Sequence, residues 1–323
     1  MTPNDKGPLS NTAPLGDTAP FADCWFLSGP TASGKTAVGL ELAGRLGAEI
    51  ISLDSMALYR RLDIGTAKPT AAERMAVPHH LIDVIEPNEE FSLARYVAAA
   101  ETAANDIRAR GRRVLFVGGT PLYLKALLRG IFKGPAADWE LRRALESSIE
   151  VHGKEWIYQR VQAVDPVAAS RLHPNDTRRL IRAYEVYQLT GQPISHLQGQ
   201  FDRARPPDEC HVYVLDWPRE ELYARINGRV EMMFAFGLVA EVKQLLAQGC
   251  QFSRSARQAL GYREVLEYLA AKRDLNDTLA SVQIRTRNFA KRQMTWFRSL
   301  SECRWIAVRG QVDPAEVAMR IAP

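Results

Sequence analysis

Residues 28–36, SGPTASGKT, constrain the fold of this chain more than any other segment. Four of them fit the pattern G-x-x-x-x-G-K-[ST], and the pattern lies between an apolar run and a helical pattern. In such a loop, backbone N–H groups and a helix N-terminus surround a phosphate, a lysine neutralises it and a hydroxyl ligates magnesium. We therefore predict a phosphate site with Thr36 as the Mg²⁺ ligand. Its residues are Gly29, Pro30, Thr31, Ala32, Ser33, Gly34, Lys35 and Thr36.

The rest of the pattern predicts an α/β fold, a doubly wound parallel sheet with an inserted all-helical domain and C-terminal helices. Strand patterns alternate with helical ones up to residue 133, and such alternation is typical of parallel sheets that bind ligands at the strands' carboxyl ends. The expected strands cover 23–28, 48–54, 80–85, 112–120, 211–217 and 303–308.

The domain boundaries follow from the same pattern. Residues 1–20 are poor in large apolar side chains, which predicts a disordered tail. We expect the first part of the core at 21–133, a helical insert at 134–210 with turns at Asp165-Pro166 and at 173–176, and completion of the core with basic helices at 211–323.

Charge is distributed unevenly, although the net charge is only +5. Residues 251–310 contain twelve Lys or Arg against five Asp or Glu, and Arg outnumbers Lys 33 to 9 in the whole chain. Guanidinium groups suit phosphate contacts and stacking on bases, so a nucleic-acid partner and a merely solvated basic face are both compatible with this composition.

Other features exclude several classes. The apolar runs are too short to cross a bilayer, and no signal peptide precedes the first strand, so we expect no membrane association and a cytoplasmic location. The four cysteines form no C-x-x-C pair, which argues against a zinc site.

The expected ends of two strands carry the candidate catalytic residues. Asp54 follows the second strand, where it is open to three interpretations: a metal ligand, a cap of the turn at 55–57, or a general base. The apolar strand VLFVGG ends in Gly118-Gly119-Thr120 without the acid that nucleotide hydrolases and kinases use to hold magnesium. Thr120 is either a reacting-centre residue or a plain N-cap before Pro121.

Several ordered blocks between about residues 26 and 300 resemble the tRNA dimethylallyltransferase (tRNA isopentenyltransferase) family. They are GPTASGKT, ISLDSMALYRRLDIGTAKP, PHHLIDVIEP, LFVGGTPLYLKALLRG, VDPVAASRLHPNDTRRLIRAYEVY, QALGYREV and TRNFAKRQMTWFR. The resemblance implies that the loop holds the diphosphate of dimethylallyl diphosphate and that Mg²⁺ is the cofactor. It implies transfer of the dimethylallyl group to N6 of the adenosine 3′-adjacent to the anticodon, with tRNA as the partner.

The resemblance also implies roles for individual residues. Asp54 corresponds to the general base, Thr120 lies near the reacting centre and Lys35 stabilises the leaving diphosphate. The tRNA anticodon stem-loop is expected to contact Asp54, Ser55, Met56, Ala57, Thr120, Arg142, Arg178, Arg179, Leu180, Ile181, Arg182, Gln258, Ala259, Leu260, Gly261, Tyr262 and Arg263. Arg178 departs from the Gln found in many relatives, which puts base reading at that position in doubt. We expect a monomer.

Two alternative functions remain at this stage. A small-molecule or nucleoside kinase explains the loop, the sheet and Asp54, but it leaves the basic C-terminal helices unexplained. An RNA-binding protein with a nucleotide switch is the second alternative. Tight binding of ATP or GTP distinguishes both from a prenyltransferase.

Overall fold

The computed structural model describes residues 20–132, 134–198 and 204–323, so the predicted N-terminal tail lies outside the described residues except for Pro20. A six-stranded sheet of order β3-β2-β4-β1-β5-β6 forms the centre, and every strand pair is parallel. This confirms the predicted doubly wound sheet. The strands are β1 (Trp25–Ser28), β2 (Ala48–Ser52), β3 (His79–His80), β4 (Arg113–Val117), β5 (His211–Asp216) and β6 (Arg304–Ala307).

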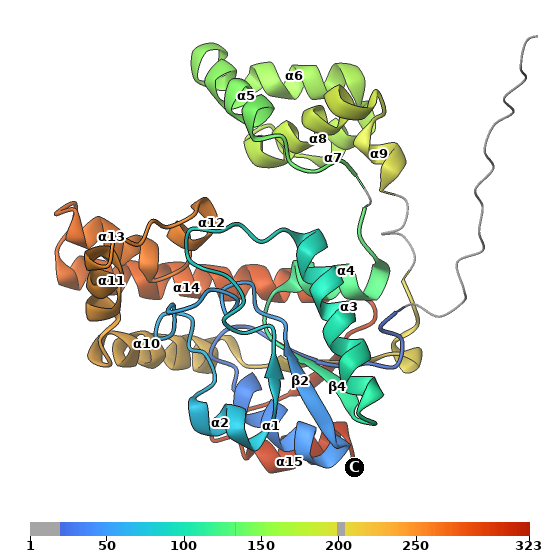
Figure 1. The fold of residues 1–323 in the computed structure, drawn as a ribbon, viewed down its shortest axis with the longest axis vertical. Helices are drawn as coiled ribbons and strands as arrows, with labels where there is room; N and C mark the ends of the chain where they lie inside the picture. The colour runs from blue at the N-terminus through green and yellow to red at the C-terminus, as the bar shows by residue number, and fades with distance from the viewer. Residues whose placement is uncertain (1–19, 133, 199–203) are drawn as a thin grey trace, which may run out of the picture.

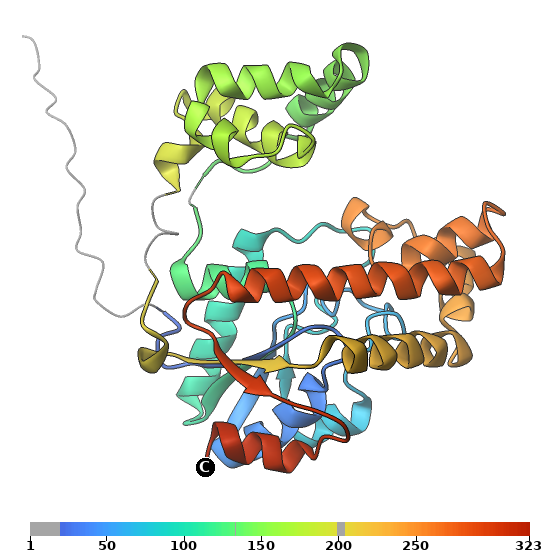
Figure 2. The same cartoon turned by 180° about the vertical axis from the view of Figure 1, so that it is seen from behind.

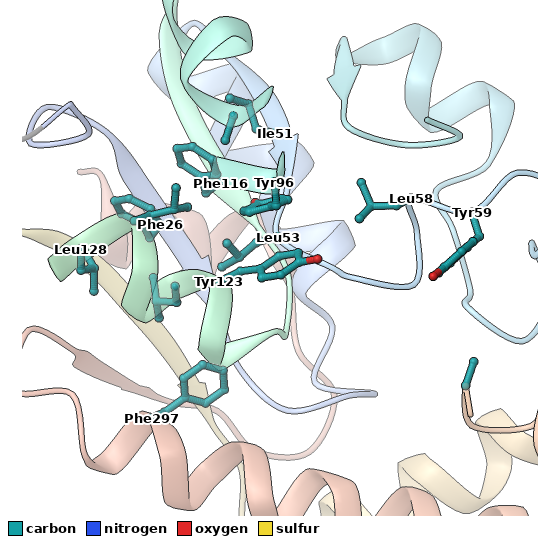
Figure 3. Close-up of a cluster of buried hydrophobic side chains, with 14 of the residues drawn as sticks. Phe26, Ile51, Leu53, Leu58, Tyr59, Tyr96, Phe116, Tyr123, Leu128 and Phe297 are labelled. Carbon is teal, nitrogen blue, oxygen red and sulfur yellow. The ribbon is translucent and has the colours of Figure 1, made fainter. Parts of the chain in front are cut away.

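Helices pack on both faces of this sheet (Figure 1). One apolar cluster joins the sheet to α1 (Lys35–Leu46) and α15 (Pro314–Ile321). The other cluster joins it to α3 (Leu93–Ala109), α4 (Pro121–Arg129) and the end of α14 (Leu275–Arg298), and Figure 3 shows part of it around Phe116. No helix in the described ranges is long and apolar enough to span a bilayer.

The core also contains helices besides these sheet-covering ones. Figure 2 shows the long α14 lying beside α10. These helices are α2 (Ala71–Ala76), α10 (Arg219–Ala235), α11 (Leu238–Ala247), α12 (Arg254–Arg257) and α13 (Tyr262–Leu269).

Two glycines explain how the chain approaches the ligand edge. Gly34 has a φ of 88°, a left-handed conformation that glycine adopts without strain, and α1 begins directly after it. Gly118 lies against β2, because a Cβ at this position would come within 2.2 Å of the carbonyl oxygen of Leu53. The backbones that follow β2 and β4 therefore lie in direct contact.

The predicted strand at 80–85 is wrong in most of its length. Only His79–His80 pairs with β2, and the backbone then turns through Leu81 and Asp83, both at positive φ. The carboxylate of Asp83 accepts hydrogen bonds from Lys68 at 2.6 Å and from Arg74 at 2.7 Å. These ion pairs hold the turn at Asp83, and the backbone N–H groups of residues 83–85 donate to the carbonyls of Ala57 and Leu58 rather than to β2.

Between the two parts of the core lies a group of helices with an apolar core of its own, which we call the helical module (residues 139–197). Figure 1 shows it standing beside the sheet rather than on it. The module comprises α5 (Trp139–His152), α6 (Lys154–Val164), α7 (Pro166–Arg171), α8 (Thr177–Thr190) and α9 (Ile194–Leu197), and the short helix η2 (Pro207–Glu209) precedes β5.

One predicted turn in the module is a helix start. Asp165 ends α6, and its side chain accepts a hydrogen bond from the backbone N–H of Ala168 at 2.8 Å, while Pro166 occupies the first position of α7. Proline fits there because its missing N–H would have no helical partner.

Candidate active site

A cavity of about 1300 Å³ opens at the carboxyl ends of β1, β2 and β4. Residues 31–37 of the phosphate-binding loop, 54–57 after β2 and 118–120 after β4 line it. Side chains of α10 and α14 complete its wall, and Arg178 of the helical module also lines it. The fold thus brings the predicted loop, Asp54 and Thr120 into one cavity, at the place where open α/β sheets bind ligands.

Side chains from inside and outside the loop hold its carbonyl groups. Trp217 donates to the carbonyl of Ser33 at 3.0 Å, and Arg225 donates to the carbonyl of Ala32 at 2.9 Å. Lys35 Nζ donates to the carbonyl of Pro30 at 2.6 Å. These contacts fix the shape of the loop, so less ordering entropy is lost when an anion binds.

Gly29 and Pro30 have a different place from the rest of the loop. They do not belong to the cavity lining, which begins at Thr31. Gly29 packs on β5, since a Cβ there would lie 3.2 Å from the carbonyl oxygen of Leu215. Their contribution is therefore to the shape of the loop and to the position of Lys35.

Two cationic side chains of the cavity, Lys35 and Arg229, are buried away from water. Burial, followed by the positive charge of Arg229, lowers the pKa of Lys35 to about 7, and the charge of Asp54 acts in the opposite direction. Burial also lowers the pKa of Arg229, which Asp54 again opposes. Arg229 forms no hydrogen bond or ion pair with any described residue. Two neighbouring cations without a bound carboxylate favour an anionic ligand.

Asp54 and Thr120 hold the ends of β2 and β4 together. Asp54 Oδ1 accepts a hydrogen bond from the backbone N–H of Met56 at 2.8 Å, so the carboxylate does cap the turn after it. Thr120 Oγ1 accepts from the N–H of Ser55 at 3.1 Å and makes no capping bond to its own helix. Thr120 therefore occupies the N-cap position of α4, but its side chain binds the Asp54 turn instead of capping the helix.

The structure divides the predicted tRNA residues into different environments. Arg178 lines the cavity together with Ser55, Met56, Ala57, Gln258, Ala259 and Leu260. Arg179 is exposed next to Asp176, and Arg263 is exposed next to Glu267.

Other residues that we predicted to contact tRNA already have partners within the protein. Arg142 and Arg182 both bind the fully buried carboxylate of Glu185, at 2.8 Å and 2.5 Å. Leu180 and Ile181 are core residues of the module. The prediction of contacts through these two side chains requires correction, because buried side chains cannot reach a ligand.

Tyr262 and Gly261 need the same correction. The Tyr262 ring is buried, and its hydroxyl donates to Glu241 and accepts from the N–H of Gly65. Gly261 begins α13 with its N–H bonded to Glu264. Tyr262 holds the segment at 62–69, and Gly261 holds the start of α13. Neither residue lines the cavity.

Sequence reasoning did not assign the cavity residues of α10, although it left open which arginine completes the diphosphate site. Arg225 and Arg229 stand four residues apart, so they share one face of α10, and both line the cavity. The i, i+4 spacing was a usable signal, but it does not reveal which partner the face meets. Arg285, Asn288 and Arg292 of α14 also line the cavity.

The described residues suit the predicted magnesium ion only as an ion that a bound phosphate group helps to hold. No group of three His, Cys, Asp or Glu that could hold a metal occurs among the residues with described positions. Thr36 lines the cavity and offers one hydroxyl. Mg²⁺ keeps several waters and binds through substrate phosphates, so Thr36 suits an ion that arrives with a diphosphate rather than a resident metal.

Comparisons with known proteins find relatives that match most of this chain. A model of the IPP transferase family matches residues 57–300. The tRNA dimethylallyltransferase of Geobacter metallireducens is 46% identical, covering 89% of this chain and 93% of that protein. The enzyme of the same name from Rhodopirellula baltica is 48% identical, covering 88% and 87%.

Solved structures give the same result. The full-length tRNA isopentenylpyrophosphate transferase of Bacillus halodurans aligns with a TM-score of 0.67 at 38% identity, covering 93% of this chain and 94% of that one. A eukaryotic dimethylallyltransferase acting on tRNA aligns with a TM-score of 0.71 at 28% identity, covering 88% and 73%.

Proposed function

Because this chain belongs to the IPP transferase family, we propose that it transfers a dimethylallyl group from dimethylallyl diphosphate to N6 of the adenosine 3′-adjacent to the anticodon of tRNA. The observation that carries the proposal is the convergence of Lys35, Arg229 and Asp54 in one cavity. There the negative charge of Asp54 acts to raise the pKa of both cations, against the effect of burial. A site with two unpaired cations and one carboxylate suits a reaction in which an anion leaves and a proton is removed.

The diphosphate end of the donor binds to the phosphate loop. Lys35, the loop N–H groups and Arg229 neutralise the charge that develops on the leaving oxygen when the C1–O bond breaks. Thr36 would hold Mg²⁺, which would supply further neutralisation of the leaving diphosphate. The preformed loop keeps these groups in place, so little reorganisation accompanies bond breaking.

Asp54 acts as the general base on the acceptor side. The N6 amine of adenine is a weak nucleophile because its lone pair is delocalised, so a proton must leave as the N6–C1 bond forms. Asp54 receives that proton, and its bond to Met56 orients the carboxylate. Thr120, which holds the Asp54 turn, stands beside the reacting amine.

The tRNA anticodon stem-loop lies between the helical module and α14. Arg178 from the module and Arg285 and Arg292 from α14 line the same cavity as Asp54. The adenine must leave its stack to enter this cavity, and backbone contacts elsewhere offset the cost of unstacking. Because tRNA is the acceptor, we place the protein in the cytoplasm, and we expect it to act as a monomer.

The direct test is incubation of the wild-type protein with an anticodon stem-loop and radiolabelled dimethylallyl diphosphate. We expect label in the RNA and none when the acceptor adenosine is replaced by guanosine. Transfer of phosphate from ATP to a small acceptor, without prenyl transfer, would overturn the proposal in favour of the kinase alternative.

A further inference from the structure

Gln293 connects two walls of the cavity that belong to distant parts of the chain. It lies on α14 with only 3% of its surface exposed. Its Oε1 accepts a hydrogen bond from the backbone N–H of Thr31 in the phosphate loop at 2.9 Å. Its Nε2 donates to the carbonyl oxygen of Gly119, the residue before Thr120. One side-chain amide therefore spans from the anion site to the loop that carries Thr120.

The amide of Gln293 packs closely against the backbone of Gly119. A Cβ at Gly119 would lie 2.6 Å from Nε2 of Gln293 and 3.6 Å from Nζ of Lys35. The amide, the Gly119 backbone and the Lys35 ammonium are thus direct neighbours. A side chain at residue 119 would therefore collide with the amide of Gln293.

The contact is not needed to attach α14 to the core. Apolar neighbours of Gln293 on the same helix, Met294 and Phe297, already pack into the main apolar cluster (Figure 3 shows Phe297). A leucine at 293 would fill a similar volume. What an apolar side chain cannot do is bind a donor on one loop and an acceptor on the other at the same time.

We propose that Gln293 is a positioning residue that fixes the distance between the diphosphate loop and the wall formed by Asp54 and Thr120. Its two hydrogen bonds set where the donor carbon stands relative to the acceptor amine. α14 also presents Arg285, Asn288 and Arg292 to the cavity, so the same helix aligns the RNA side with the donor side. This inference rests on the proposed transfer reaction.

The first test replaces Gln293 by an apolar side chain. Gln293→Leu should lower kcat on the order of 10–100-fold, because small misplacements of reacting groups cost rates of this size. The Kd for inorganic diphosphate by calorimetry and the Kd for the stem-loop by filter binding should each change less than about threefold, because the binding groups themselves remain.

The matched control is Gln283→Leu. Gln283 lies on the same helix and donates to Glu231 of α10 at 3.1 Å, outside the cavity lining. This variant should keep the wild-type kcat. A Gln293→Leu protein that is folded by circular dichroism and has an unchanged kcat, with only a lower Tm, overturns the proposal in favour of a structural role.

A second variant tests the donor half of the contact. Gln293→Glu keeps an acceptor for Thr31, but the ionised carboxylate repels the carbonyl of Gly119, whereas the protonated form donates to it as the amide does. The kcat of this variant relative to wild type should therefore rise as the pH falls from about 8 to about 5, with burial raising the pKa of the introduced carboxyl and Lys35 opposing that shift. A ratio independent of pH contradicts the proposal.

The two proposals fail in different ways. If the wild-type protein binds diphosphate and RNA but transfers no prenyl group, the proposed function is wrong. If wild type and Gln283→Leu transfer normally and Gln293→Leu does so as well, only the role of Gln293 is wrong.

Discussion

Two cations of the cavity, Lys35 and Arg229, and two arginines of the helical module, Arg142 and Arg182, have opposite surroundings. In the cavity, Lys35 and Arg229 are buried and bind no carboxylate, and burial lowers the pKa of both. In the module, Arg142 and Arg182 bind the buried Glu185. Charges without a partner suit a ligand, whereas paired charges suit the fold. The same residue type therefore serves chemistry in one region and architecture in the other.

The largest effect should come from the cavity carboxylate. Asp54→Asn keeps the side-chain shape and the oxygen that caps the turn but cannot accept a proton. We expect kcat to fall on the order of 10²–10⁴-fold, the usual scale of general base catalysis, with little change in the Kd for inorganic diphosphate. Near-normal turnover together with a lower Tm would instead assign Asp54 to the turn alone.

The next effect belongs to the module. Glu185→Gln removes the buried negative charge that Arg142 and Arg182 bind. Breaking a buried ion pair costs about 3–5 kcal/mol. We expect the module to lose structure first, which hydrogen exchange resolved by mass spectrometry would detect. The control is Glu146→Gln, which breaks an exposed pair with Arg254 and should cost less than about 1 kcal/mol.

The same pair predicts the acid response of the module. Burial of Glu185 would raise its pKa, but hydrogen bonds from Arg142 and Arg182 outweigh burial and lower it. A carboxyl with a lowered folded-state pKa stabilises the fold above its unfolded pKa and loses that contribution as the pH falls through the folded value. Exchange in the module should therefore increase on acidification before exchange in the sheet does.

A fourth prediction concerns Lys35 of the cavity. Lys35→Ala removes the main fixed cation beside the leaving group, and loss of one such group costs on the order of 10²–10³-fold in kcat. Lys35→Arg is the control for charge. In wild type, affinity for inorganic diphosphate should weaken as the pH rises above the Lys35 pKa of about 7, because the neutral amine no longer attracts the anion. A pH response equal in wild type and Lys35→Ala would contradict that assignment.

The smallest effect concerns RNA binding by the module. Arg178 lines the cavity and has no ion pair within the described chain, so it is free to contact a phosphate. Arg178→Ala should reduce the slope of log affinity against log salt by roughly 0.7–0.9, the value for one phosphate contact. The control Lys154→Ala removes an exposed charge at the start of α6, and there an unchanged slope is expected. If the two variants behave alike, the RNA does not lie on the cavity side of the module.

Much of the fold was predictable because it depends on local patterns. The phosphate loop, the helix after it and most strands follow from glycine positions and apolar periodicity, and the comparisons confirm the family. The exception is the strand at 80–85, where Lys68 and Arg74 bind Asp83 and hold a turn in place of the strand. Nothing local in the sequence indicates those pairs.

The residues of the site divide in the same way, into those that local sequence identifies and those that only the packed structure reveals. The sequence by itself determined which residues could surround a phosphate and which carboxylate follows β2, since both depend on neighbours within a few positions. Only the tertiary structure decided that Arg142 is held by Glu185, that Arg229 is left without a partner among the described residues, and that Gln293 reaches Thr31 across 262 residues. The physical reason is that burial and pairing of a charge depend on the elements packed around it, and those come from parts of the chain that no local pattern relates.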